Sequence, residues 1–327
     1  MPSHDKRLEL YAFPQRLVDI GGRRINVCLS GKGSPTVIMA PGMGGSTINW
    51  VRVQRRLESS FQVMSYDRAG LGFSDPGPMP RTSTNIVGDL RAVLSALKIA
   101  PPYVLVGHSA GSFDVRLFAF QHPEEVAGMV LVDPSTEWQV ERFAQITGRG
   151  KALNDAAQSL YLRCEAAAAA GALTPGSAAH AECVWPPDPS LPDSVNAATR
   201  ARCLTPDLWR TLYSENFSFF DGESSGQLRA ASRKLGAMPL IVLTAGKLDW
   251  GREPDEAEKL YGIWRELHED LAALSSRGVR REVQNAGHGI QVERPDVVAD
   301  AIREVIALAG ASTERQNVKS PMLKPVL

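Results

Sequence analysis

The feature that most constrains the fold is an alternation of short apolar runs and helical patterns between residues 35 and 134. The runs PTVIMA, QVMSY, YVLVGH and AGMVLVD contain few polar residues, as expected of strands buried on both faces. Between them, residues 85–99 repeat apolar side chains at the spacing of an amphipathic helix. This order predicts an α/β fold with a mostly parallel central sheet and helices on both faces.

The alternation stops near residue 134 and resumes near residue 236. Residues 135–235 contain an alanine run, several prolines and many aromatic residues but no apolar strand, so we predict an inserted, mainly helical lid. The core is then expected to comprise residues 1–134 and 236–310, with a closing helix over 295–309. The polar segment 311–327 is expected to be disordered.

The charge balance argues against several classes of partner. The chain has 36 basic and 36 acidic residues, so it lacks the basic excess typical of nucleic-acid or anionic membrane binding. No run approaches the roughly 18 apolar residues that a membrane span needs. The charged first residues do not resemble a signal peptide, so we expect a cytoplasmic location. A leader already removed would leave the same appearance, which keeps a periplasmic or secreted location open. The protein is expected to be a monomer or a homodimer.

The four cysteines match no zinc-binding spacing, so no metal site is predicted. Cys28 stands alone in an expected strand, whereas Cys164, Cys183 and Cys203 share the middle segment. Reduced, partly buried thiols are the favoured interpretation. A disulfide between two of the three middle cysteines is the alternative.

Residues 102–117, PYVLVGHSAGSFDVRL, place a serine between two glycines where an expected strand becomes a helix. Gly107 and Gly111 permit a sharp turn and close packing at that junction. Ser109 would then stand clear of the sheet at a helix N-terminus, where backbone N–H groups stabilise a developing negative charge. In this context Ser109 is the predicted nucleophile, with a purely structural turn as the alternative.

A serine nucleophile needs a base to accept its proton and a carboxylate to hold that base. Of the six histidines, His288 lies in a glycine-flanked loop between the last expected strand and the final helix, which makes it the predicted base. His108 is too constrained by the turn to reach the serine oxygen. Asp249 and Asp133 both follow expected strands and both satisfy the chain order Ser…Asp…His. We favour Asp249, in the short Gly-Lys-Leu-Asp loop, and keep Asp133 as the alternative.

An oxyanion hole requires two backbone N–H groups near the nucleophile. Ala110 should supply one of them, and the glycine-rich loop APGMGGS should supply the other through Met43. The Met43 side chain would also line the substrate pocket. Further pocket residues, for which plain packing is the alternative, are the aromatic side chains Trp138, Trp209, Phe217 and Trp250.

Taken together, these motifs resemble the α/β-hydrolase fold superfamily of the esterase and lipase kind. The matching blocks, in the family's order, are YDRAGLGFSDPGP, YVLVGHSAGS, VAGMVLVDP, PLIVLTAGKLD and AGHGIQVERPDVVADAI. The resemblance implies Ser109 as nucleophile, Asp249 as acid and His288 as base. Many relatives have His-Gly before the oxyanion residue where this chain has Pro41-Gly42, but a backbone amide serves in either case.

A serine at the elbow argues against haloalkane dehalogenases, which use an aspartate there. Serine, histidine, aspartate and an oxyanion hole suit acyl transfer to water, for which no metal or organic cofactor is needed. We therefore predict a serine hydrolase that cleaves a small, uncharged and fairly apolar carboxylic ester. With the same residues, amidase or aminopeptidase, lactonase, carbon–carbon hydrolase and cofactor-free perhydrolase activities are alternatives. A hydrolase-fold ligand-binding receptor is the alternative from another class.

Overall fold

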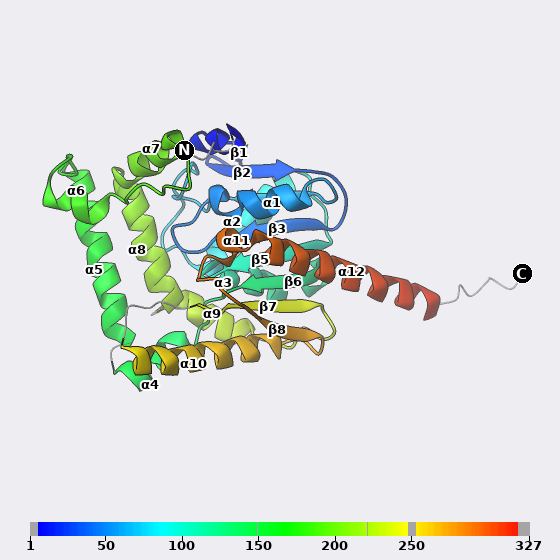
Figure 1. Cartoon of the computed structure of the whole chain (residues 1–327). Coiled ribbons are helices and arrows are strands. Elements are labelled where there is room, and N and C mark those ends of the chain that lie inside the picture. The colour runs from blue at the N-terminus through cyan, green and yellow to red at the C-terminus, as the bar shows by residue number, and fades with distance from the viewer. Residues whose placement is uncertain (1–5, 149, 221, 248–252, 320–327) are drawn as a thin grey trace, which may run out of the picture.

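The computed structural model describes residues 6–148, 150–220, 222–247 and 253–319, and an eight-stranded sheet forms its centre (Figure 1). The strands lie in the order β1-β2-β4-β3-β5-β6-β7-β8. β1 pairs antiparallel with β2 and β2 antiparallel with β4, whereas all later neighbours are parallel, which confirms the predicted mostly parallel sheet. The strands span Leu17–Asp19 (β1), Arg24–Ser30 (β2), Thr36–Ala40 (β3), Val63–Tyr66 (β4), Tyr103–His108 (β5), Val126–Val132 (β6), Leu240–Ala245 (β7) and Gly278–Val283 (β8).

The central strands are apolar because both faces of the sheet are covered. Every residue of β3, β4, β5 and β7 is buried. By contrast β8, with the sequence GVRREV, alternates between more and less buried positions because it is the last strand of the sheet. The difference between continuous and alternating apolar patterns therefore follows directly from position in the sheet.

Helices pack on both faces of the sheet and form two apolar layers. One layer joins α1 and α12 to the sheet through side chains such as Val53 and Ile302. The opposite layer joins α2, α3 and the end of α10 through side chains such as Leu90, Phe113 and Leu271. The elements of the core outside the sheet are η1 (Lys6–Ala12), η2 (Thr47–Trp50), α1 (Val51–Leu57), α2 (Ser83–Ala96), α3 (Gly111–Gln121), η3 (Pro123–Glu125), α10 (Pro254–Ala272), α11 (Ile290–Glu293) and α12 (Pro295–Lys319).

In the described part of the chain, six helices separate β6 from β7, and we call them the helical insertion. They are α4 (Gln139–Thr147), α5 (Gly150–Ala169), α6 (Ala178–Cys183), α7 (Asp193–Cys203), α8 (Pro206–Phe220) and α9 (Glu223–Ala231). In Figure 1, α5 and α8 run side by side at one edge of the molecule. Trp209, Leu212 and their neighbours form a separate apolar cluster within the insertion, to which Leu71 of the core also belongs.

The C-terminal segment differs from its prediction. Helix α12 continues to Lys319, so residues 311–319 are helical rather than disordered. This stretch, ASTERQNVK, is polar but includes alanine, glutamate, arginine and glutamine, which extend a helix at little cost. Within the described residues, no helix has both the length and the apolar character needed to cross a membrane.

The structure joins Cys164 of α5 to Cys183 of α6 by a disulfide, while Cys28 and Cys203 are free. This corrects the favoured expectation of reduced thiols throughout and selects one pairing among the middle cysteines. The two cysteines meet because α5 and α6 pack against each other within the insertion. Both half-cystines are buried in the apolar cluster of the insertion.

We expect thiol titration of the unfolded, unreduced protein to find two thiols, from Cys28 and Cys203, and four after reduction. Because the bridge closes a loop across 19 positions, replacing it by Cys164→Ser/Cys183→Ser should lower the free energy of unfolding by about 3 kcal/mol. Thermal unfolding of a Cys28→Ser variant, which retains the bridge, serves as the control. Four reactive thiols before reduction would contradict the disulfide.

Candidate active site

Ser109 lies at the turn between β5 and α3, where the sequence predicted it. Its φ of 50° is left-handed, a conformation that residues other than glycine seldom adopt and that turns the chain sharply. Its N–H donates to the Val132 carbonyl, and its own carbonyl accepts from the N–H groups of Ser112 and Ser135. These bonds tie the turn to the end of β6 and hold the strained residue in place.

The glycines on either side of Ser109 are required by packing. A Cβ on Gly111 would lie 2.5 Å from the Pro41 carbonyl oxygen and 2.6 Å from that of Ala40, both in the backbone. A Cβ on Gly107 would lie 2.8 Å from the Cα of Ser112. The glycine pattern therefore allows the start of α3 to approach the end of β3.

His288 lies in the loop between β8 and α11, and its imidazole contacts a buried carboxylate. The distance from its Nδ1 to Oδ2 of Asp133 is 2.6 Å. The Asp133 side chain is fully buried, whereas 49% of the His288 side chain is exposed. One ring nitrogen of His288 is thus fixed, and the ring retains access to solvent.

The carboxylate that meets His288 is the alternative that the sequence left open. Asp133 directly follows β6, the parallel neighbour of the strand that carries Ser109. The favoured acid, Asp249, and the pocket candidate Trp250 lie outside the described residues, which omit 248–252. Both aspartates follow parallel strands, so the chain order alone could not distinguish them.

Asp133 accepts three hydrogen bonds from residues that the structure describes, and its φ of 41° is a conformation that few aspartates adopt. Its Oδ1 accepts from the N–H of Ala245 and from Nε1 of Trp264, each at 2.9 Å. Burial by itself would raise the pKa of Asp133, but the bond and charge of His288, the charge of His268 and the Ala245 N–H outweigh it and lower the pKa. The carboxylate is therefore held ionised beside the imidazole.

His268 supports this acid from α10, a role that sequence reasoning missed. It is buried, its Nδ1 lies 2.9 Å from the Thr244 hydroxyl and its Nε2 lies 2.9 Å from the Pro134 carbonyl oxygen. Burial lowers its pKa to about 4, so the ring is neutral at pH 7. The signal was its position on the apolar face of a helix otherwise rich in charge, beside Trp264.

His108 has a second positioning role that the sequence did not reveal. Its Nε2 lies 2.9 Å from the backbone carbonyl oxygen of His288, and the two ring centroids are 4.7 Å apart. Burial, followed by the charge of His288, lowers its pKa to about 3. Because a carbonyl only accepts, the neutral ring must carry its hydrogen on Nε2. His108 therefore fixes the backbone of the loop that carries His288.

The structure does not bring every predicted partner into contact. Among the residues it describes, no hydrogen bond joins the Ser109 hydroxyl to the His288 ring. Catalytic hydrogen bonds are often long without substrate and tighten when it binds. Ser109 nevertheless follows His108 directly in the chain, and the His108 ring lies against the His288 ring, so Ser109 and His288 lie at the same wall of the site.

The glycine-rich loop after β3 passes close to Ser109. A Cβ on Gly42 would lie 3.1 Å from the Cβ of Ser109 and 2.8 Å from Nδ1 of His108. In the described part of the chain, neither the N–H of Met43 nor that of Ala110 has a hydrogen-bond acceptor. Two unpaired amide donors thus lie in the segments that flank the serine.

A cavity of about 530 Å³ opens between this loop and the helical insertion. Two of the predicted pocket residues, Met43 and Trp209, line it. Trp138 and Phe217 do not; their side chains are 49% and 45% exposed. Trp185, another aromatic residue of the insertion, also lines the cavity and lies near Gly44 of the loop.

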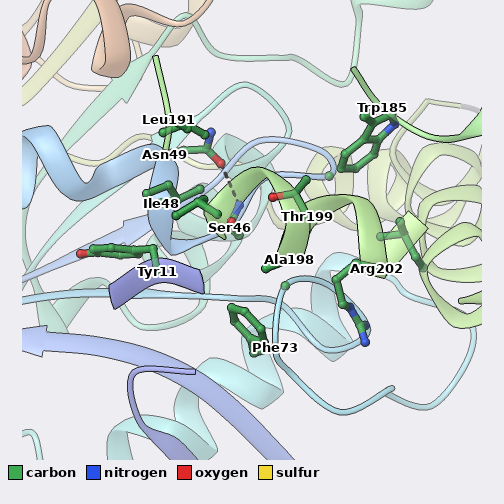
Figure 2. A pocket seen from close by; sticks show the side chains of 14 residues that line it. Tyr11, Ser46, Ile48, Asn49, Phe73, Trp185, Leu191, Ala198, Thr199 and Arg202 are labelled. Carbon is green, nitrogen blue, oxygen red and sulfur yellow. Dashed lines mark hydrogen bonds between the residues drawn. The ribbon is translucent and has the colours of Figure 1, made fainter. Parts of the chain in front are cut away.

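A second cavity, of about 210 Å³, also has Trp185 in its lining (Figure 2). Its lining includes Ala198 and Thr199 of α7, Ile48 of η2 and Phe73 of the loop after β4, all labelled in Figure 2. Gly44, Asn49 and Trp185 line both cavities, which are therefore adjacent. The insertion and the core each contribute one wall.

One group of potential metal ligands occurs among the described residues, and it lies away from this site. His122, Glu124 and Glu125 place ligand atoms within 4.8 Å of one another around η3. The group is exposed or half-buried, and Glu125 is paired with Arg91 at 3.0 Å. It offers no connection to the chemistry at Ser109.

With the fold and site described, the chain can be placed in a family. The model of the alpha/beta hydrolase fold family matches residues 35–295, so the chain belongs to that family. It is 26% identical over 275 residues to the uncharacterized protein YqjL of Bacillus subtilis, covering 84% of this chain and 85% of that protein. A shorter match, 34% identical over 103 residues, covers 31% of this chain and 38% of a putative carbamate hydrolase, RutD, from Klebsiella pneumoniae.

Solved structures show the same fold at low sequence identity. A loop variant of the haloalkane dehalogenase DbeA from Bradyrhizobium elkanii aligns with a TM-score of 0.65 and 15% identity. The alignment covers 92% of this chain and 98% of that structure. The family and its hydrolase members support a hydrolase activity for the chain, but this similarity alone does not define the substrate.

Asp114, on the helix that follows Ser109, provides a test of the electrostatics beside the site. Burial raises its pKa to about 7, against the lowering influence of Arg68. The unfolded chain ionises this group near pH 4, so wild-type stability should fall as the pH rises from about 4 to about 7. Asp114→Asn should therefore gain thermal stability relative to the wild type between pH 5 and pH 8.

Asp75→Asn is the matched control, because its Arg24 partner lowers the pKa of Asp75 and places that titration below pH 5. Its difference in Tm from the wild type should be the same at pH 5 and pH 8. An equally constant difference for Asp114→Asn would show that Asp114 is ionised across this range, contrary to expectation.

Proposed function

We propose that this protein is a serine hydrolase that cleaves an uncharged, fairly apolar carboxylic ester through an acyl-enzyme intermediate. The observation that carries the proposal is the strained Ser109 turn beside a histidine whose Nδ1 is held by a buried aspartate. A strained serine at a turn between strand and helix is typical of a nucleophile in this family, and Ser109 is half-buried at such a turn. Burial of the acid and partial exposure of the base suit proton transfer to and from substrate.

In the proposed mechanism, the Ser109 hydroxyl attacks the ester carbonyl and passes its proton to Nε2 of His288. Nδ1 of His288 keeps its hydrogen because Asp133 accepts it, and the carboxylate stabilises the imidazolium that forms. The imidazolium then gives its proton to the departing alkoxide, which leaves as the alcohol. Water, deprotonated by His288, attacks the acyl-serine and releases the acid and free Ser109. Asp133, rather than Asp249, is the acid in this proposal.

The oxyanion hole is proposed to consist of the N–H groups of Met43 and Ala110. Neither N–H group donates a hydrogen bond to another described residue, and both lie in segments that flank Ser109. Two such donors stabilise the negative charge that develops on the carbonyl oxygen in the transition state. The absence of a histidine before Gly42 leaves this backbone role intact.

The proposed substrate class follows from the larger cavity. Besides Met43, its apolar lining comprises Leu160, Tyr161, Trp185, Trp209 and Leu212. Among the described residues that line it, none is basic and Glu182 alone is acidic; Glu182 accepts a hydrogen bond from Arg163. Such a lining favours an uncharged apolar group over a carboxylate or ammonium.

We further propose that residues 135–235 act as a lid over a core of residues 1–134 and 236–310.

We propose that the protein works in an oxidising compartment rather than in the cytoplasm. Disulfides persist in secreted and periplasmic proteins and are rare where thiols are kept reduced. The Cys164–Cys183 bridge therefore favours the periplasmic or secreted location over the cytoplasmic one that the sequence favoured.

Substitutions at the catalytic residues test the mechanism. With 4-nitrophenyl butyrate, Ser109→Ala and His288→Ala should each lower kcat by about 10⁴-fold or more, and Asp133→Asn by roughly the same factor, since it leaves the wrong tautomer of the histidine. Asp249→Asn should stay within about 3-fold of the wild type, because Asp133 already contacts Nδ1 of His288 and the proposed mechanism assigns Asp249 no step. Full activity in Asp133→Asn together with loss in Asp249→Asn would reverse the assignment of the acid.

A substrate panel tests the ester class and the receptor alternative. Neutral short- to medium-chain and aromatic nitrophenyl esters should be hydrolysed faster than charged or very long ones, because the cavity is apolar and of limited volume. Carbamate, amide and lactone substrates belong in the same panel. Labelling of Ser109 by a fluorophosphonate without turnover of any substrate would favour the ligand-binding receptor over the enzyme.

A further inference from the structure

A fully buried ion pair connects the helical insertion to the loop beside Ser109. Arg68, in the loop after β4, and Glu215, in α8, both have side chains with 0% exposure. Nε of Arg68 donates to Oε1 of Glu215 and Nη2 donates to Oε2, each at 2.8 Å. The two residues are 147 positions apart in the sequence, so this bidentate contact joins distant parts of the chain.

The other side of the Arg68 guanidinium faces the glycine-rich loop after β3. Its Nη1 donates to the carbonyl oxygen of Pro41, and its Nη2 donates to that of Gly42 at 2.9 Å. The Gly42 oxygen also accepts the N–H of Gly45 at 3.0 Å. One planar group therefore holds a carboxylate and two consecutive carbonyls, which requires the fixed fork of an arginine.

The Gly42 carbonyl and the Met43 N–H belong to the same peptide group. In a planar trans peptide these two groups point in opposite directions, so a carbonyl held toward Arg68 directs the N–H away from it. Gly42 itself lies against the Cβ of Ser109. A hydrogen bond from a cation to the carbonyl also polarises the peptide group and makes its N–H a stronger donor.

We propose that Arg68, held in place by Glu215, is a positioning residue that fixes the Met43 N–H for the oxyanion and so makes the oxyanion hole depend on α8. The inference rests on the proposed function, because it takes Met43 as an oxyanion donor. Arg68 does not touch the reacting atoms in this arrangement. It acts through the peptide group between Gly42 and Met43.

The energetics of the pair favour such a role over stability alone. Removing two charges from water is costly, and a well-packed apolar pair often stabilises a protein equally well. Burial alone would lower the pKa of Arg68, but the charge and hydrogen bonds of Glu215 outweigh it and raise that pKa, so the guanidinium stays charged. A permanent cation with all its contacts buried is well suited to orient a dipole.

The central test is the variant Arg68→Met/Glu215→Met, which removes both charges together and leaves no unpaired ion in the core. Complete loss of one oxyanion donor costs about 10²- to 10³-fold in kcat. The variant keeps the Met43 N–H and loses only the contact that orients it, so kcat for 4-nitrophenyl butyrate should fall less, by about 10- to 100-fold, with KM within about 3-fold. Affinity for a trifluoromethyl ketone, which forms a tetrahedral adduct with serine, should fall by the same factor as kcat.

The matched control is Arg81→Met/Asp89→Met, which removes another buried ion pair, an arginine and an aspartate joined at 2.7 Å. Asp89 also accepts from Arg23, whose side chain is 23% exposed and therefore keeps access to water when Asp89 is replaced. Arg81 donates to Pro78 and Asp89 rather than to the loop after β3. Because this control does not touch the loop after β3, its kcat should stay within about 3-fold of the wild type. Such a change is smaller than the tenfold change in rate that about 1.4 kcal/mol of activation free energy produces. Wild-type kcat in a folded Arg68→Met/Glu215→Met variant, or a rise in KM alone, would overturn the proposal.

Two single substitutions keep the proposal testable if the double variant does not fold. Glu215→Gln preserves the shape and an acceptor for Arg68, so it should lower kcat less than Arg68→Lys does, because an ammonium cannot hold both carbonyls and the carboxylate in a fork. An unchanged kcat in Arg68→Lys would overturn the proposal.

Fluorophosphonate labelling separates this inference from the proposed function. In that reaction the Ser109 oxygen forms a bond to phosphorus, fluoride leaves, the proton passes to His288, and the phosphoryl oxygen occupies the oxyanion hole. If the wild type hydrolyses no ester, the proposed function fails. The ratio of labelling rates still tests Arg68: slower labelling of the folded double variant than of the wild type and the control supports the inference, and equal rates overturn it.

Discussion

The candidate site depends on the parallel pairing of β5, β6 and β7. Parallel neighbours end at the same edge of the sheet, so the residues that follow them meet although they are far apart in the sequence. Ser109 follows β5, Asp133 follows β6, and the last residue of β7, Ala245, donates its N–H to the Asp133 carboxylate. A change of register in any of these strands would separate the acid from its donors.

The loop that carries His288 and the segment after Asp133 are each held to this edge by a buried histidine. His108 at the end of β5 binds the carbonyl of His288, and His268 of α10 binds the carbonyl of Pro134, next to the acid. Both act as neutral donors to backbone oxygens. The base and the acid are thus each positioned through the main chain as well as through their contact with each other.

Much of the core and part of the site could be predicted from sequence. Apolar runs without alternation indicated strands buried on both faces, and the glycines around Ser109 marked the turn, because both patterns are local. The choice between Asp133 and Asp249 could not be made, because it depends on which loop folds toward His288. The pairing of Cys164 with Cys183 likewise depends on how two helices pack.

The aromatic side chains of the insertion illustrate the same limit. Trp209 is buried and lines the larger cavity, whereas Trp138 is half exposed and lies beneath Arg229, whose guanidinium carbon is 4.1 Å from the ring centroid. Composition cannot separate them, since the orientation of a helix against the core decides which side is buried. Arg68 was hidden for a related reason: its motif suggested a family block, but its partner Glu215 comes from the insertion.

The two neutral histidines give the edge that carries the candidate site a particular sensitivity to acid. With pKa values of about 3 for His108 and about 4 for His268, the folded chain resists protons that the unfolded chain accepts near pH 6.5. The stabilisation associated with these depressed values is present above pH 6.5 and is lost progressively as the pH falls toward 4. The wall formed around Ser109 and His288 therefore also helps to set the lowest pH at which the whole protein stays folded.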